Sequence, residues 1–457
     1  MRGFLASSIG VTCAAALALP LTLPSSGARA ATQDAHPPAV RSAESVPGST
    51  QSLPLTPLGS DRSLGGASSE QGLLRREVRP FSLVGVVWDD PDDELHGSVQ
   101  VRTRASGTGT WSSWQQVETH NHEHAADPGS EERASGKVRG STAPLWVGDS
   151  DGVEIRVRGE APRHRASAGS PAEQALPSGL RLELVDPGAE PPPQGSTPEK
   201  PRTPALTAET AASSAVNADL APLGAAAIPA LSKKETESDL IAARGGPDEA
   251  AGKARPYVGP RPRIITRNGW GANEKLRERQ FGYSKTVKAA FVHHSATGNN
   301  YRCSQAGSVL RSIYRYHVKS SGWRDFGYNF AVDKCGNIYE GRAGGVAKPV
   351  LGAHTLGFNT NSMGIAVLGS FGYSSPPAAA VNAVARLTAW KLGLYGANPR
   401  GKTYLKSGGG NLYKKGRNVR LHVISGHRDG FATECPGSRL YSKLGKARST
   451  SARYQGR

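Results

Sequence analysis

The residues best suited to chemistry are histidines and one cysteine within residues 257–457. His293 ends a short apolar run typical of a buried strand, and His427 follows Ser-Gly after another predicted strand. Cys435 lies eight positions beyond His427, where a helix is predicted to begin. A catalytic zinc uses three protein ligands and leaves one position open for water. Two strand ends and a helix start therefore predict a His–His–Cys zinc site, with His354 and His422 as competing ligands.

The chemistry of these positions restricts the ligand set. His293 and His294 are neighbours on a predicted strand, so their side chains point to opposite faces and only one can be a ligand. We expect His294 to pack or to bond a backbone carbonyl. A helix N-terminus lowers the pKa of a nearby thiol, which would favour Cys435 as a thiolate.

The first thirty residues predict a secretory signal. Arg2 precedes a largely apolar run, and Ala28-Arg29-Ala30 forms an A-x-A cleavage site. A membrane anchor is the alternative, but the run is short and Pro20 breaks it. We therefore expect a secreted, extracellular, cell-wall-associated protein without another transmembrane span.

The cysteine count supports the metal hypothesis. Cys13 lies within the predicted signal, so Cys303, Cys335 and Cys435 remain. An odd number in an oxidising compartment leaves one cysteine as a free thiol, an interchain partner or a metal ligand. The most economical solution is a Cys303–Cys335 disulfide with Cys435 bound to a metal. The alternative is that Cys435 is simply buried.

Charge is divided unequally along the chain. Residues 1–256 contain 24 Lys and Arg against 31 Asp and Glu, a net charge of −7, whereas residues 257–457 contain 32 against 7, a net charge of +25. A basic domain favours a polyanionic partner. Secretion makes nucleic acid an unsuitable partner, so we expect an anionic wall polymer. A basic surface without a dedicated partner, or a toxin or proenzyme masked by its acidic half, is the alternative.

Composition and periodicity divide the chain into successive parts. The predicted parts are a signal peptide (1–30), a disordered leader (31–74), a small all-β sandwich-like domain (75–190), a Pro/Ala-rich linker (191–256), an α/β domain with a mixed central sheet and flanking helices (257–448) and a tail (449–457). Histidines alternate in His120-Asn121-His122-Glu123-His124, which suits a metal on an extended segment. Acidic neighbours and the lack of an ordering element favour a solvated loop there.

Several short motifs follow one another in the α/β region. They are Phe-Val-His-His-Ser-Ala-Thr (291–297), Gly-Tyr-Asn-Phe (327–330), Tyr-Glu-Gly-Arg (339–342), Gly-Ala-His-Thr (352–355), Gly-Ile (364–365), Gly-His-Arg-Asp (426–429) and Thr-Glu-Cys-Pro-Gly (433–437). This ordered set resembles the zinc-dependent N-acetylmuramoyl-L-alanine amidase family of peptidoglycan recognition proteins and phage T7 lysozyme. The resemblance covers about residues 262–444. Residues 78–187 resemble the β domain that precedes such amidases in secreted actinomycete proteins.

The resemblance implies a role for five residues. His293, His427 and Cys435 fall on the zinc ligands, and Tyr328 falls on the catalytic tyrosine. Thr433 occupies a position that is lysine in the phage enzyme and threonine in animal recognition proteins. Non-catalytic members typically lose the zinc cysteine, so the presence of Cys435 implies activity.

The implied reaction is hydrolysis of the amide between N-acetylmuramic acid and the L-alanine of the peptidoglycan stem peptide, with Zn²⁺ as cofactor. We expect Tyr328 and Thr433 to stabilise the oxyanion, His354 and Arg342 to contact substrate, and the chain to be a monomer. A structural histidine is the alternative for His354, and an ion pair that holds the fold is the alternative for Arg342. The alternative function is a recognition module that binds peptidoglycan without cutting it.

Overall fold

The computed structural model describes residues 48–58, 70–160, 175–189, 206–244 and 256–457. The predicted signal peptide, with Cys13, lies outside these residues. Among the helices in the described ranges, none has both the length and the apolar character needed to cross a bilayer.

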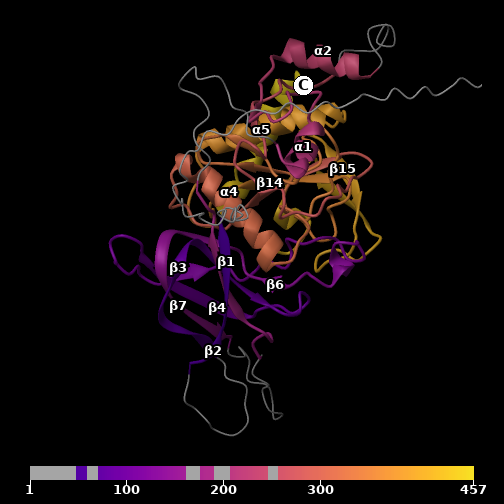
Figure 1. The fold of residues 1–457 in the computed structure, drawn as a ribbon. Coiled ribbons are helices and arrows are strands. Elements are labelled where there is room, and N and C mark those ends of the chain that lie inside the picture. Colours follow the sequence, from indigo (N-terminus) through magenta and orange to yellow (C-terminus); the bar gives the residue numbers. More distant parts are fainter. Residues whose placement is uncertain (1–47, 59–69, 161–174, 190–205, 245–255) are drawn as a thin grey trace, which may run out of the picture. The chain divides into compact units, whose positions relative to one another are not determined.

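The first described part is an antiparallel β domain (Figure 1). Its strands are β1 (Ser49–Pro54), β2 (Thr56–Pro57), β3 (Glu70–Trp88), β4 (Gly97–Ala105), β5 (Gln115–Val117), β6 (Gly140–Ser141), β7 (Leu145–Gly159) and β8 (Arg181–Asp186). The order is β1-β8-β3-β7-β4-β5, with β2 and β6 paired to β3. Residues 49–57, predicted to belong to a disordered leader, instead form β1 and β2. Pairing of β1 with β8 over six residues orders this polar segment.

The apolar run at the end of β3 is buried on both faces. Val84 and Val86 pack in the core of the β domain, together with residues of β4, β7 and β8. Leu83 and Val87 point to the opposite face and join a second cluster with the C-terminal domain. Because side chains alternate along a strand, an almost continuous apolar sequence here indicates two buried faces.

The C-terminal domain is built on a seven-stranded mixed sheet in the order β17-β11-β14-β12-β13-β10-β9. The strands are β9 (Ala227–Ile228), β10 (Ile264–Ile265), β11 (Ala289–His294), β12 (Phe330–Val332), β13 (Ile338–Glu340), β14 (Ser362–Val367) and β17 (Ile424–Gly426). Strand β11, second from the β17 edge, is parallel to both β14 and β17. A separate hairpin consists of β15 (Lys402–Lys406) and β16 (Asn418–His422).

Helices cover both faces of this sheet. They are α1 (Ala208–Ala215), α2 (Lys233–Ala243), α4 (Ala306–Arg315), α5 (Ala378–Leu394), α6 (Ser438–Tyr441) and α7 (Leu444–Gln455). Residues of α5 and α7 share one core with β11, β12 and β14. Residues of α4 share the other core with Ala331 of β12 and Ala366 of β14.

The structure extends this domain beyond the predicted 257–448. Part of the predicted linker forms α1 and α2, and β9 joins the sheet next to β10. Ser232 and Glu235 form a capping box at the start of α2, a pattern that stabilises a helix end. The Pro/Ala-rich composition of residues 191–256 led to the prediction of a linker instead of this helix. The predicted tail likewise continues α7, because Ala452 packs against the domain with 0% exposure.

Helix α4 connects the two domains because it is buried all round. Val309, Leu310 and Ile313 belong to one apolar cluster that also contains residues of the mixed sheet and of the β domain. Tyr316 follows α4, and its hydroxyl oxygen lies 3.2 Å from the carbonyl oxygen of Val86 in β3. Gly85 leaves room for this ring, since a Cβ there would lie 2.3 Å from the Tyr316 hydroxyl.

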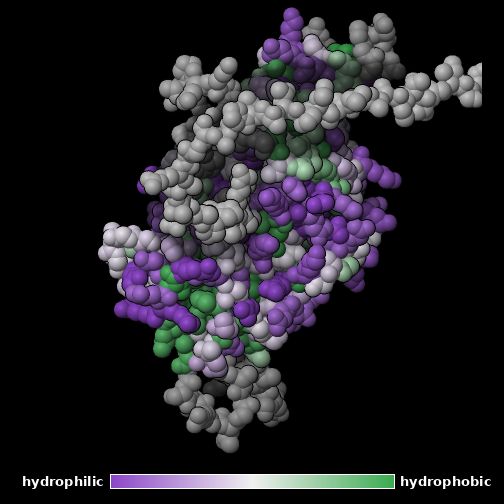
Figure 2. Space-filling view, viewed as in Figure 1, coloured by the Kyte–Doolittle hydropathy of each residue, from purple (hydrophilic) through white to green (hydrophobic). Residues whose placement is uncertain are grey.

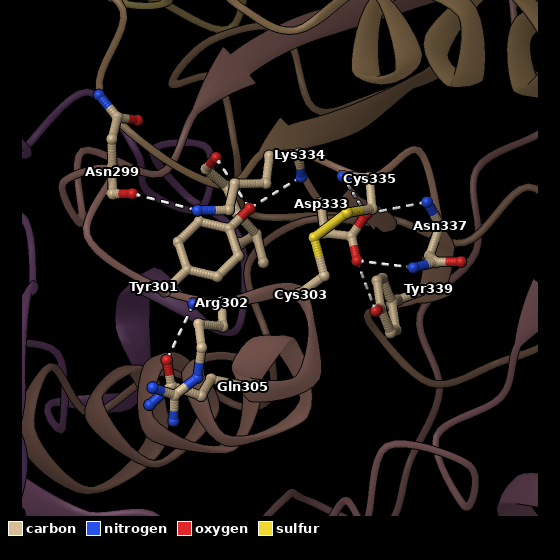
Figure 3. The surroundings of a disulfide bond; sticks show 11 residues. Asn299, Tyr301, Arg302, Cys303, Gln305, Asp333, Lys334, Cys335, Asn337 and Tyr339 are labelled. Carbon is tan, nitrogen blue, oxygen red and sulfur yellow. Dashed lines mark hydrogen bonds between the residues drawn. A yellow bond between two sulfur atoms is a disulfide. The ribbon is translucent and has the colours of Figure 1, made fainter.

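A disulfide fixes the start of α4. Cys303 and Cys335 are bonded, with Cα atoms 6.2 Å apart and a separation of 32 positions in sequence (Figure 3). Cys335 lies in the turn between β12 and β13, where the Asp333 carboxylate accepts hydrogen bonds from the backbone N–H groups of Cys335 and Asn337. The bond therefore ties the interdomain helix to the sheet.

We predict that the Cys303→Ser/Cys335→Ser variant loses about 2 to 4 kcal/mol of unfolding free energy, because the unfolded chain is no longer cross-linked. Denaturant unfolding with and without a phosphine reductant measures this. Reduction should lower the wild-type midpoint to that of the variant and leave the variant unchanged. A wild-type midpoint that reduction does not move would contradict the prediction.

Candidate metal centre

Parallel strand pairing places two histidines at the same edge of the sheet. In β11, Val292 is level with Gly426 of β17, and His293 is the next residue. His427 directly follows Gly426, so the two side chains leave neighbouring parallel strands at the same level. Ligand sites in open α/β sheets lie at the carboxyl ends of strands, and both rings are fully buried there.

Cys435 reaches the same place through a short loop after β17. The Arg428 N–H donates to the Cys435 carbonyl over 3.1 Å. The Cys435 N–H in turn donates to the Thr433 hydroxyl oxygen over 3.1 Å. These bonds bring the Cys435 Sγ within 3.8 Å of the His293 Nδ1.

A third histidine, His124, completes the cluster from the segment between β5 and β6 of the β domain. One potential ligand atom from each of His124, His293, His427 and Cys435 lies within 4.8 Å of all the others. The His124 ring centroid is 4.4 Å from that of His427 and 5.2 Å from that of His293. Sequence reasoning missed this residue, because the tract 120–124 was predicted to be a solvated loop. The alternating histidines were the available signal.

The surroundings of the cluster suit a zinc ion. Only 5% of His124 is exposed, and both of its ring nitrogens and both of those of His427 lack a hydrogen-bond partner among the described residues. Buried polar atoms without a hydrogen-bond partner lower the stability of the folded state. Four His and Cys donors are a common tetrahedral zinc set, with donor atoms about 3.4 to 3.8 Å apart. A small contraction of the cluster would give that spacing.

Burial sets the protonation of these groups. It lowers the pKa of His124, His293 and His427 well below the ordinary value, and the neighbouring histidines add to this effect. The rings are therefore neutral at pH 7, the form that binds metals. Burial also raises the pKa of the Cys435 thiol, so a bound cation is needed to hold it as thiolate. The predicted help from a helix N-terminus is not seen, because α6 has only four residues.

A chain of hydrogen bonds orients His293. Its Nε2 lies 3.4 Å from the Thr355 hydroxyl, which lies 3.0 Å from the His354 Nδ1. The Ser362 hydroxyl lies 3.5 Å from the His354 Nε2 and donates to the Phe358 carbonyl. One assignment satisfies every contact: His293 donates to Thr355, Thr355 to His354, and His354 to Ser362. It leaves the His293 Nδ1 lone pair free on the side of Cys435.

Tyr328 and Thr433 both border the cluster. The Tyr328 ring centroid lies 5.3 Å from that of His293 and 5.9 Å from that of His124. Burial, with the nearby Cys435 and Glu123, raises the pKa of Tyr328 well above its ordinary value, so its phenol stays protonated. The Thr433 hydroxyl donates to the Glu123 Oε1 over 2.6 Å. Glu123 therefore accepts the one proton that the Thr433 hydroxyl can donate. Sequence reasoning missed Glu123 as well.

The structure places the two predicted substrate contacts away from open solvent. His354 is fully buried behind His293 and lies on the hydrogen-bond chain rather than in a groove wall. Burial, followed by the Arg342 charge, lowers its pKa to about 3. Arg342 makes a two-pronged ion pair with Glu132 of the β domain, with bonds of 2.8 and 2.9 Å. The other predicted competitor, His422, lies in the β15–β16 hairpin and outside the cluster.

His294 points away from the cluster, as its alternation with His293 requires. Its Nδ1 accepts a bond from the Phe371 N–H over 3.4 Å, a backbone amide where a carbonyl was expected. An acceptor role requires a neutral ring, and burial lowers the pKa of His294 to about 4.

We predict that Thr355→Val weakens Zn²⁺ binding by about 10- to 100-fold, because His293 loses the partner that fixes its tautomer. Competition with a chromophoric chelator measures the affinity. Thr355→Ser keeps the hydroxyl and should bind like the wild type. Equal affinities for the valine and serine variants would show that the hydrogen-bond chain does not orient the ligand.

Comparison with known proteins follows the same division of the chain. Residues 283–438 match the family model described as N-acetylmuramoyl-L-alanine amidase, and residues 37–179 match one described as Rv3811 N-terminal galactose-binding domain-like. Peptidoglycan-recognition protein SC1a/b of Drosophila simulans is 33% identical over 181 residues, which cover 40% of this chain and 83% of that protein. Peptidoglycan-recognition protein SC1a of Drosophila melanogaster is 30% identical with the same coverage.

Two solved structures extend the comparison. Wild-type Drosophila PGRP-LB is 25% identical, with a TM-score of 0.32, and the match covers 40% of this chain and 91% of that one. Peptidoglycan recognition protein-LE in complex with tracheal cytotoxin is 29% identical, with a TM-score of 0.33, over 40% and 92% of the two chains. From its sequence relatives, the chain belongs to the family of peptidoglycan-recognition proteins and N-acetylmuramoyl-L-alanine amidases.

Proposed function

We propose that the protein is a secreted, zinc-dependent N-acetylmuramoyl-L-alanine amidase that cleaves between N-acetylmuramic acid and the L-alanine of peptidoglycan. The observation that carries the proposal is the meeting of His293, His427 and Cys435 with the Tyr328 ring at one sheet edge. Two histidines and a cysteine are a known ligand set for catalytic zinc. Membership of the family supplies the class of substrate.

The three ligands would hold Zn²⁺, which supplies a Lewis acid for the scissile carbonyl and lowers the pKa of water to about 7. The chain itself keeps His293 in one tautomer through Thr355 and keeps the ligand rings neutral by burial. Both features are present before substrate binds, so they need no rearrangement during the reaction.

Tyr328 and Thr433 would act on the carbonyl oxygen of the substrate. The protonated Tyr328 phenol can donate a hydrogen bond to negative charge that develops there. The Thr433 hydroxyl accepts from the Cys435 N–H, and its proton, which Glu123 accepts in this structure, would be donated to the substrate once Glu123 is displaced. Donors aimed at developing charge are each worth about 10²- to 10³-fold in rate.

A location outside the cell agrees with two features of the chain. The Cys303–Cys335 disulfide favours an oxidising compartment. The β15–β16 hairpin carries exposed basic side chains, and Figure 2 shows hydrophilic residues over much of the face around β15. These basic residues are Lys402, Lys406, Lys414, Lys415, Arg417 and Arg420. Such a surface would attract an anionic wall polymer.

The amidase assay should use both the full chain and its His124→Ala variant, because His124 lies among the ligands. Each is incubated with isolated peptidoglycan, and mass spectrometry detects stem peptides that begin with L-alanine. We expect release that a chelator abolishes, that Zn²⁺ restores and that Cys435→Ala eliminates. Metal-loaded protein that binds peptidoglycan without releasing peptides in either form would favour a recognition module.

We also predict that Tyr328→Phe, made in the His124→Ala background, lowers kcat by about 10²- to 10³-fold because one oxyanion donor is lost. Zinc content should stay the same. Tyr314→Phe is the matched control, since its buried hydroxyl bonds the Asn273 carbonyl away from the cluster. A rate for Tyr328→Phe within a few-fold of the control would remove Tyr328 from the mechanism.

A further inference from the structure

We infer that His124 of the β domain is a fourth metal ligand, and that residues 121–132 occupy the substrate groove of the same chain in a latent state. The regulatory part of this inference rests on the proposed amidase function. The ligand assignment rests on the cluster alone. We call residues 121–132 the insert.

The first argument is coordination. A catalytic zinc keeps a position open for water, whereas a structural zinc has four protein ligands. His293, His427 and Cys435 leave one position open, and His124 lies where it can fill that position. Its ring is almost completely buried, and neither ring nitrogen has a hydrogen-bond partner among the described residues. A neutral imidazole in this place has no evident role other than metal binding.

The second argument is that the insert is anchored to the loop that follows His354. The Leu356 N–H donates to the Glu123 carbonyl over 2.9 Å. The Asn359 side-chain amide donates to the Ala125 carbonyl over 2.8 Å. The Asp127 carboxylate accepts from the Gly357 N–H at 2.8 Å and from the Asn359 side-chain amide at 2.7 Å. Backbone and side chains of the insert thus bind one side of the site like a bound peptide.

The insert also binds the other residues that a substrate would need. Glu123 accepts the Thr433 hydroxyl proton that the proposed mechanism requires. Glu132 takes both prongs of the Arg342 guanidinium, and both side chains are only 8% exposed. Burial alone would raise the pKa of Glu132, but Arg342 outweighs it and the net shift is downward. The carboxylate is therefore charged, as an ion pair with Arg342 requires.

The insert and the C-terminal domain line a common cavity. This cavity of about 440 Å³ is lined by Asp127, Glu131 and Glu132 of the insert and by Tyr283, Arg342 and Gly352. None of the four cluster residues lines this cavity, and all four are at most 5% exposed. Access to the metal therefore requires that the insert leave.

The β domain holds the insert at this site through an independent contact. Leu83, Val87 and Val185 share a buried apolar cluster with α4, and Tyr316 fills the space over Gly85. A ligand delivered on a docked domain acts at a high effective concentration, since it is tethered beside its site. The acidic insert thus masks part of the basic domain.

The test uses full-length protein loaded with Co²⁺, whose visible spectrum reports the ligands directly. Sodium azide is the probe, because it binds Co²⁺ only at an exchangeable position. We expect the wild-type spectrum to be insensitive to azide and the His124→Ala spectrum to shift with it. His120→Ala, an exposed change in the same segment, should behave like the wild type.

A second variant keeps the test independent of the ligand itself. Asp127→Ala removes an anchor of the insert without altering the cluster, and we expect it to give partial sensitivity to azide. Circular dichroism and one bound Co²⁺ per chain establish that each variant is folded. The inference is overturned if azide shifts the wild-type spectrum as fully as that of His124→Ala, or if His124→Ala leaves the wild-type spectrum unchanged.

Peptide release from peptidoglycan separates this inference from the proposed function. We expect His124→Ala to release stem peptides about tenfold faster than wild type or more, since freeing the groove shifts a closed–open equilibrium by at least that factor. The expected azide response without any hydrolysis would leave the fourth ligand in place and overturn both the amidase and its latency. Equal hydrolysis by wild type and His124→Ala would overturn latency while leaving the amidase.

Discussion

The parallel pairing of β11 with β14 and β17 is the constraint on which the site depends. It puts His293 and the residue after β17 at one level, where both rings are fully buried. Burial then keeps the rings neutral, and both nitrogens of His427 lack a hydrogen-bond partner among the described residues. Buried nitrogens without partners lower stability. A bound cation would remove this cost, because it would bind the nitrogens and stabilise the Cys435 thiolate at the same time. Fold and metal chemistry therefore depend on the same strand register.

The second determinant is that β3 and α4 are each buried on two sides. Each contributes to its own domain and to the contact between domains. This contact is apolar at α4 and polar at the insert, where Glu123, Asp127 and Glu132 find donors on the C-terminal domain. The apolar part fixes position, and the polar part specifies which side chains meet. The separation of acidic and basic halves along the sequence thus has a structural counterpart.

Local structure could be predicted from the sequence where a single pattern, such as an apolar run, extended over the whole segment. The buried strand that carries His293 follows from its apolar run. The meeting of His293, His427 and Cys435 was anticipated from strand ends and from motif resemblance. For His354 the sequence left a substrate contact and a structural histidine as alternatives, because its position beside Gly-Ala does not indicate which neighbours cover the ring.

The role of the insert could not be read from its own residues. His124 reaches ligands about 170 and 300 positions away in sequence. The alternating histidines suited a metal, but a loop without periodicity does not indicate which distant residues it contacts. Helices α1 and α2 were hidden for a related reason, since their polar sequences are stabilised by caps and by docking on the domain. Tertiary contacts outweigh composition in both cases.

The most direct measurement is an anomalous difference map, at the zinc edge, from crystals of the full-length protein grown with Zn²⁺. The account predicts one peak bonded to His124, His293, His427 and Cys435, with the insert in the groove. A peak bonded only to His293, His427 and Cys435, with solvent in the fourth position and His124 turned away, would contradict the closed site. The absence of any peak at this cluster would contradict the metal centre itself.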